Sequence, residues 1–187
     1  MVEQSLNIAD VMVKVILGLI GLYLAHSYQR KIALNVAEKR LVAYSALWSR
    51  MICASPVRQS EWMDEPLTSK ERKELFKDFT AWYYVNGNGM LLGGSTRSIY
   101  LCVKDNLVCP IDYYKPESTR TRLKMMSHEE QEKERGRLSI RQLSLLRNRM
   151  KADLEVYGPT YHTELNDDAK ALLRCCGEDL SSKVWKG

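Results

Sequence analysis

Phenylalanine, proline and strand-like patterns are scarce in this sequence. It contains 2 Phe and 5 Pro in 187 residues, beside 10 Tyr. No segment alternates apolar and polar residues over the length of a strand, except the short stretch Gly89–Leu92. There is also no internal repeat and no low-complexity tract. These absences argue against a sandwich of strands and favour a helical protein.

Cysteine and histidine are too few and too scattered to indicate a disulfide framework or a metal centre. The 5 cysteines are odd in number, and no two have the Cys-x-x-Cys spacing of a zinc site. The adjacent pair Cys175–Cys176 fits two small residues at a helix end, although acylation or metal binding stays open. The 3 histidines have no Cys, Asp or Glu at ligand spacing on a shared helix face. We therefore expect reduced thiols, no metal and no cofactor.

The charge balance is mildly basic. Lys and Arg number 28 against 23 Asp and Glu, which gives a formal net charge of +5. Apolar residues make up 45% and charged residues 27%, as in a globular chain. An excess this small does not indicate nucleic acid, so the placement of the charges is more informative than their sum.

A long apolar stretch lies near the N-terminus, from Ile8 to Ala25. Val15–Ala25 carries no charge, and extension back to Ile8 adds only Asp10 and Lys14. A membrane helix needs about 20 mostly apolar residues, and this stretch qualifies if Asp10 and Lys14 lie near the outer interface. A cleaved signal peptide or a buried helix of a soluble protein would be the alternatives. The leader lacks a basic region and a small-x-small cleavage site, and Val15–Ala25 has no polar face, so we expect a membrane anchor.

The charges that flank this stretch predict its orientation. Arg30, Lys31, Lys39 and Arg40 follow it, whereas no Lys or Arg precedes it. The positive-inside rule therefore predicts an outside N-terminus and a cytoplasmic C-terminal domain. For a bacterial protein, this means a single-pass protein of the inner membrane.

The remainder of the chain shows helical patterns with clear ends. The apolar residues of Tyr28–Met51 recur at spacings of three and four, so one helix of about 65 Å could run from Ile8 to Met51. Thr68–Glu71 and Ser127–Glu130 both fit the capping box, and Asn86-Gly87 is a helix stop. Further helices are expected from Ser95 or Thr96 to Pro110, from Ser127 to Gly158, and over Asp167–Cys176. We expect Pro110–Ser127 to be a loop.

The predicted fold class is all-α. An N-terminal transmembrane helix continues into an antiparallel helical bundle of four to five helices. The predicted domains are residues 1–27, the N-terminal segment and transmembrane helix; 28–158, the cytoplasmic bundle; and 159–187, a C-terminal extension with a short helix.

The glycine-rich stretch Gly89–Thr96 resembles a phosphate-binding loop only superficially. Ser95 stands where a P-loop needs lysine, and a helix precedes the stretch where a P-loop needs a strand. A weaker anion site is conceivable, because a helix N-terminus offers free N–H groups. It would consist of Gly93, Gly94, Ser95, Thr96 and Arg97. The competing interpretation is a helix–turn–helix connection in which Met90, Leu91 and Leu92 fill the bundle core.

Basic residues run along the helix predicted after Ser127. The candidate basic surface comprises Arg137, Arg141, Arg147 and Lys151. It could meet anionic headgroups or a nucleotide, or it could be a solvated face paired with glutamates. No aromatic residue lies between Arg135 and Lys151, so nucleic acid is not an expected partner.

Three blocks of sequence resemble a group of uncharacterised bacterial membrane proteins. They are EKRLVAYSALW (Glu38–Trp48), WYYVNGNGMLL (Trp82–Leu92) and LSLLRNRMKADLEVYG (Leu143–Gly158). The resemblance implies a single-span protein with a cytoplasmic helical domain, and it implies no activity.

No recognisable catalytic site emerges from these patterns, and we expect the protein not to be an enzyme. The expected function is a membrane-anchored helical module for protein interaction or sensing. Its expected partners are the lipid bilayer and either another protein or further copies of itself. The alternative is an anion- or nucleotide-responsive membrane effector that binds at Gly93–Arg97.

Overall fold

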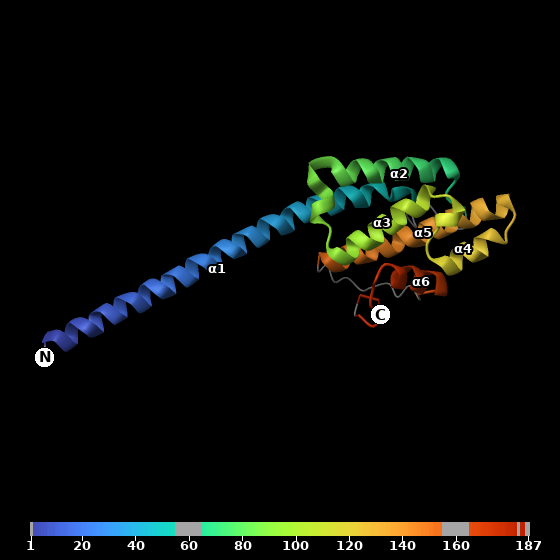
Figure 1. Cartoon of the computed structure of the whole chain (residues 1–187). Helices are drawn as coiled ribbons and strands as arrows, with labels where there is room; N and C mark the ends of the chain where they lie inside the picture. The colour runs from blue at the N-terminus through green and yellow to red at the C-terminus, as the bar shows by residue number, and fades with distance from the viewer. Residues whose placement is uncertain (1, 55–64, 155–164, 183, 186–187) are drawn as a thin grey trace. The chain divides into compact units, whose positions relative to one another are not determined.

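The computed structural model describes residues 2–54, 65–154, 165–182 and 184–185, with side chains from residue 10 onward. The chain forms two compact units, Met1–Lys39 and Arg40–Gly187. The sequence predicts the first domain boundary after residue 27. The helices are α1 (Val2–Arg50), α2 (Ser69–Tyr84), α3 (Gly94–Val108), α4 (Glu117–Lys124), α5 (His128–Asp153) and α6 (Asp167–Cys175). Short 3-10 turns are η1 (Ile52–Ala54), η3 (Val85–Leu91) and η4 (Ile111–Tyr113). The described residues contain no strand, which confirms the all-α prediction (Figure 1).

The first unit consists of the N-terminal part of α1. The helix has a stretch apolar enough to cross a membrane, with a mean hydropathy of 1.6 over its best window, and none of that window is buried. The large apolar side chains between Val11 and Leu24 are 49% to 71% exposed. A core helix of a soluble protein would bury such residues. This property of α1 is consistent with the predicted membrane helix.

Local capping signals position three helices of the second unit, two of them at the predicted capping boxes. The Thr68 and Ser127 hydroxyls accept from the backbone N–H groups of Glu71 and Glu130, and both capping boxes are complete. Asn166 caps α6. These bonds form between residues three apart, so they can be recognised without tertiary information.

The stop signal after α2 is also confirmed. Asn86 and Gly87 have left-handed backbones with φ of 51° and 70°, and α2 ends just before them. Glycine adopts this conformation without the steric cost of a Cβ. The chain therefore turns from α2 towards α3 at the predicted position.

Two local predictions were wrong. The expected loop 110–127 contains η4 and α4, and α4 buries only Thr119 and Leu123. A two-turn helix with so narrow an apolar face leaves little periodic signal. Met90 was expected in the core but is 80% exposed, whereas Leu92 is 4% exposed. The left-handed turn before it directs Leu92 inward and leaves Met90 outside.

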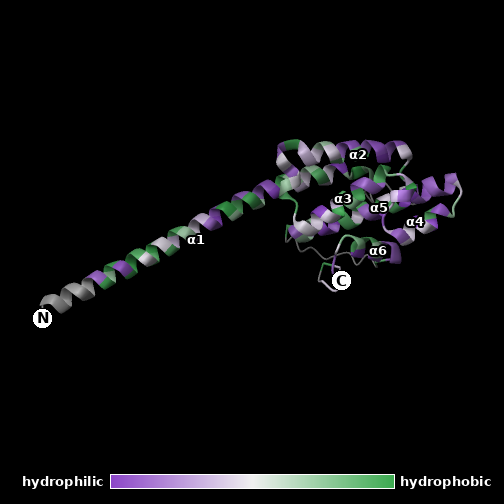
Figure 2. Cartoon of the chain, in the orientation of Figure 1, coloured by the Kyte–Doolittle hydropathy of each residue, from purple (hydrophilic) through white to green (hydrophobic). Residues whose placement is uncertain are grey.

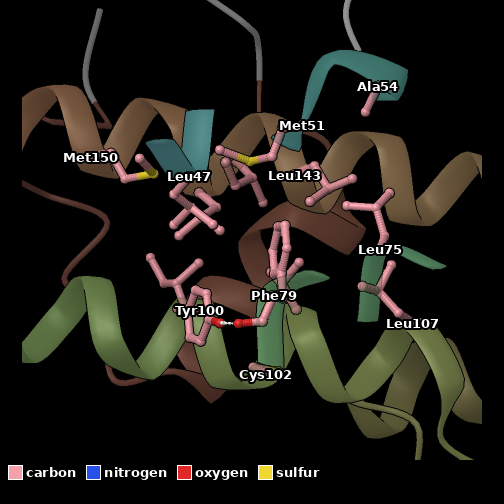
Figure 3. Close-up of a cluster of buried hydrophobic side chains, with 14 of the residues drawn as sticks. Leu47, Met51, Ala54, Leu75, Phe79, Tyr100, Cys102, Leu107, Leu143 and Met150 are labelled. Carbon is pink, nitrogen blue, oxygen red and sulfur yellow. Dashed lines mark hydrogen bonds between the residues drawn. The ribbon is translucent and has the colours of Figure 1, made fainter. Parts of the chain in front are cut away.

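The bundle core is formed mainly where α3 packs between α2 and α5. Tyr100 stacks on Phe79 with ring centroids 5.5 Å apart, and its hydroxyl donates to the Phe79 carbonyl at 2.6 Å (Figure 3). Leu47 of α1, Met51 directly after α1, and Leu143 and Met150 of α5 belong to the same cluster. Leu172 and Leu173 of α6 are buried in it as well. Helix α4 is mostly hydrophilic, and α2 carries hydrophilic residues along much of its length (Figure 2).

Candidate functional site: charged clusters at the two ends of α3

Helix α3 has no side-chain cap and no favourable end charge of its own. Its N-cap, Gly93, makes no side-chain cap, and the helix has no acidic residue in its first turn and no basic residue in its last turn. Such ends leave backbone N–H and C=O groups and the helix dipole uncompensated. Charged groups from other helices lie at both ends.

At the N-terminal end of α3, a buried carboxylate is held by two hydroxyls. Asp153, the last residue of α5, has a side chain 9% exposed. Its Oδ2 accepts from the Thr96 hydroxyl at 2.6 Å and from the Tyr44 hydroxyl at 2.8 Å. The Gly93 N–H donates to the Tyr44 oxygen at 3.4 Å. The carboxylate thus joins α1, α3 and α5 in the first turn of α3, where negative charge is favoured.

Burial governs the chemistry of Tyr44. Desolvation, followed by the hydrogen bond to Asp153, raises the pKa of Tyr44 well above its ordinary value. The phenol therefore stays neutral and donates its proton to the carboxylate. Thr96 has no exposed surface. This arrangement orders three helices and offers no nucleophile to a substrate.

The cluster continues into the C-terminal segment through Arg149. The guanidinium of Arg149 lies 3.5 Å from Asp153 Oδ1 and 3.4 Å from Glu178 Oε2. The Trp185 indole donates to the same Glu178 oxygen at 2.9 Å. The two carboxylates share one guanidinium, so the cluster has an excess of negative charge. It links the chain after α6 to α5.

At the C-terminal end of α3, the buried charges have the opposite sign. Arg72 of α2 is 2% exposed and forms an ion pair with Glu132, and its Nη1 donates to the Leu107 carbonyl at 3.4 Å. Arg135 donates to the Cys109 carbonyl at 2.7 Å and lies 3.4 Å from the same glutamate. Two guanidinium groups share one carboxylate, and both contact carbonyls that end α3. Burial, and then the neighbouring Arg135, lower the pKa of Arg72.

The structure locates the predicted anion site of Gly93–Arg97 beside the negative cluster. A Cβ on Gly93 would lie 2.7 Å from Asp153 Oδ2, so the protein's own carboxylate lies against this turn. Gly94 and Arg97 are exposed, Ser95 is partly buried and Thr96 is buried. The Arg97 guanidinium turns back to the Gly89 carbonyl, at 3.1 Å. A phosphate ligand would meet a carboxylate at this position.

The four residues of the predicted basic surface do not share one environment. Arg137 is exposed and lies 3.8 Å from Glu134, and Arg141 is exposed and lines a small pocket together with Asp168. Arg147 is only 9% exposed and donates to the Ala54 carbonyl at 3.0 Å. Arg147 and Lys151 both lie over the Trp48 ring, at 5.8 Å and 5.4 Å from its centroid. The aromatic partner comes from α1, which is why the sequence of α5 alone did not indicate it.

Sequence patterns did not indicate either charged cluster, although one signal was available. A carboxylate in the last turn of a helix opposes the helix dipole, and Asp153 ends α5. An acidic residue there needs a compensating partner, which Tyr44, Thr96 and Arg149 provide.

No group of three or more His, Cys, Asp or Glu side chains in the described part of the chain is arranged to hold a metal ion. Comparison with protein-family models, curated proteins and solved structures gives no match for this chain. The described residues therefore define only a class, a helical protein with one candidate membrane helix among them.

Proposed function

We propose that the chain is a single-pass membrane protein whose helical bundle acts as a module for protein interaction or sensing. The observation that carries this proposal is the exposure of the apolar helix surface between Val11 and Leu24. An apolar surface of this length would be unfavourable in water and is stabilised in a bilayer. The bundle, in contrast, encloses its own core.

The orientation in the proposal follows from the flanking charges. By the positive-inside rule, Arg30 and Lys31 favour a cytoplasmic C-terminal bundle and an outside N-terminus, in the inner membrane if the protein is bacterial. The proposal includes no catalytic step, since the buried hydroxyls and carboxylates around α3 are engaged with one another. The anion-responsive alternative is not favoured by this geometry, because Asp153 lies at its proposed site.

Membrane extraction tests the anchor. We expect the protein to stay in the membrane pellet after alkaline carbonate and to dissolve in mild detergent. A control with Leu17 and Ile20 both changed to Asp should enter the carbonate supernatant, because charge at the centre of a span is costly. Release of the unchanged protein by carbonate would contradict the proposal.

Thiol accessibility tests the orientation. Cys175 is exposed, so an impermeant maleimide should label it only after the cells are permeabilised. Cys175→Ser controls for the remaining thiols, and Ser5→Cys in that background should be labelled in intact cells. The reverse pattern would overturn the orientation.

The interaction role has its own test. Chemical crosslinking in membranes, followed by gentle solubilisation and pull-down, should recover a partner protein or an oligomer. Recovery of the monomer alone would argue against a module for protein interaction.

A further inference from the structure

The end of the bundle at Arg40 carries an exposed apolar surface beside two arginines. We call it the turn surface. Its apolar members, with their exposed fractions, are Leu41 (53%), Val42 (66%), Tyr84 (76%), Val85 (49%) and Met90 (80%). Its basic members are Arg40 and Arg97.

Hydrogen bonds show that these residues belong to one end of the bundle. The Trp82 indole donates to the Ala43 carbonyl at 2.9 Å, so the end of α2 lies beside the start of the bundle part of α1. Arg40 Nε donates to the Leu91 carbonyl at 2.9 Å, which places η3 next to the same residues. The turn between α4 and α5 lies at the opposite end of the bundle (Figure 1).

The two arginines retain their charge at this surface. Arg40 and Arg97 each donate to a backbone carbonyl of η3, at 2.9 Å and 3.1 Å, and neither forms an ion pair within the described residues. Asp153, the carboxylate of α5 at this end, is already bonded to Tyr44 and Thr96. The turn surface therefore combines apolar side chains with unneutralised positive charge.

We propose that the turn surface binds the anionic lipid headgroups of the membrane in which α1 is anchored. Apolar and aromatic side chains flanked by arginine are typical of proteins that lie at the membrane interface. A second copy of the chain fits less well, because a two-fold interface centred on this surface would bring its arginines together without a carboxylate. The inference rests on the proposed anchor.

Chain length sets a condition for this contact. Residues 26–39 separate the apolar stretch from Arg40 and would span about 21 Å if they ran along the membrane normal. Because α1 is continuous from Val2 to Arg50, contact requires α1 to tilt or bend after the apolar stretch so that residues 26–39 lie close to the membrane plane. Their side chains suit that position, since Tyr28 and Ile32 are exposed apolar residues and Arg30 and Lys31 are basic.

Site-specific photocrosslinking in the full chain tests the proposal. A benzophenone amino acid replaces Met90, and the protein is reconstituted into vesicles of phosphatidylcholine alone or mixed with phosphatidylglycerol at about 7 to 3. Met125 is the matched control, because it is 83% exposed and lies in the turn between α4 and α5. A third probe at Leu22, 71% exposed in the candidate span, reports the anchor.

We expect lipid adducts at position 90 in anionic vesicles, with background levels at position 125. Changing Arg97 to Gln should reduce the adducts at position 90 about fivefold, and changing Arg40 to Gln as well should reduce them further. Arg97→Lys keeps the charge and should retain the adducts.

The other outcomes separate the two proposals. Adducts at Leu22 without adducts at position 90 would overturn lipid binding by the turn surface and leave the anchor intact. Absence of adducts at Leu22 would overturn the anchor itself. Three further results would each refute recognition of anionic lipid by the turn surface. They are equal labelling at positions 90 and 125, equal labelling in the two kinds of vesicle, and crosslinks from position 90 to a second copy of the chain.

Discussion

Replacing Asp153 by alanine should destabilise the bundle more than any change at an exposed acidic residue. The substitution removes the acceptor for the Tyr44 and Thr96 hydroxyls, which lie 2.8 Å and 2.6 Å from the carboxylate. It also leaves Arg149 with Glu178 as its remaining carboxylate. Both hydroxyls are buried, so water cannot readily replace the lost partner.

The expected magnitude follows from these contacts. A hydrogen bond to a charged group contributes about 1.5–3 kcal/mol, and the Asp153 side chain is too buried for strong screening by solvent. The loss of two such bonds, partly offset by relaxation, should lower the free energy of unfolding by about 3 kcal/mol. For a chain of this size, the corresponding decrease in Tm is about 6–12 °C. Asp153→Asn preserves the shape and one acceptor oxygen, so its effect should be about half as large.

Thermal unfolding of the full chain in detergent micelles measures this effect. Tryptophan fluorescence is a suitable signal because Trp82 is 1% exposed in the core. Asp78→Ala is the control, since Asp78 is 57% exposed and lies 3.8 Å from Arg50. A surface pair of this kind contributes at most about 1 kcal/mol. If Asp153→Ala were no more destabilising than Asp78→Ala, the carboxylate would not be holding the helices together.

Three further predictions follow from close contacts and burial. Gly93→Ala should destabilise the fold in the same unfolding assay, because the added Cβ would lie 2.7 Å from Asp153 Oδ2. Gly94→Ala is the control: its Cβ meets nothing within 4 Å, so this change should be neutral or stabilising. Gly136→Ala should also lower the Tm, although alanine is the better helix former, because its Cβ would meet the backbone preceding α2, including an N–H at 2.7 Å. Finally, a maleimide at about pH 8 should modify exposed Cys175 much faster than Cys102. The pKa of Cys102 is raised by its hydrogen bond to the Cys176 thiol and by burial. Mass spectrometry of partly labelled protein measures the two rates, and equal rates would contradict the prediction.

The sequence was informative where the determining contacts are local. Thr68 and Glu71 cap α2 across three residues, and Gly87 ends it by a backbone preference of its own. The contact between Tyr44 and Asp153 spans 109 residues, so no motif could reveal it. Met90 shows the same limit, because its apolar side chain suggested the core and only the geometry of the turn places it outside.

The two charged clusters have a common physical explanation in the ends of α3. The helix lacks a side-chain cap, an acidic residue in its first turn and a basic residue in its last turn, so groups on other helices must compensate its ends. Asp153 supplies negative charge at its first turn, and Arg72 and Arg135 bind the carbonyls of Leu107 and Cys109 at its other end. This is the arrangement that the helix dipole favours. The cost falls on α5, which ends in a carboxylate. Arg149 of the same helix and the hydroxyls of Tyr44 and Thr96 on α1 and α3 stabilise this carboxylate, so the N-terminal end of α3 depends on assembly of the bundle.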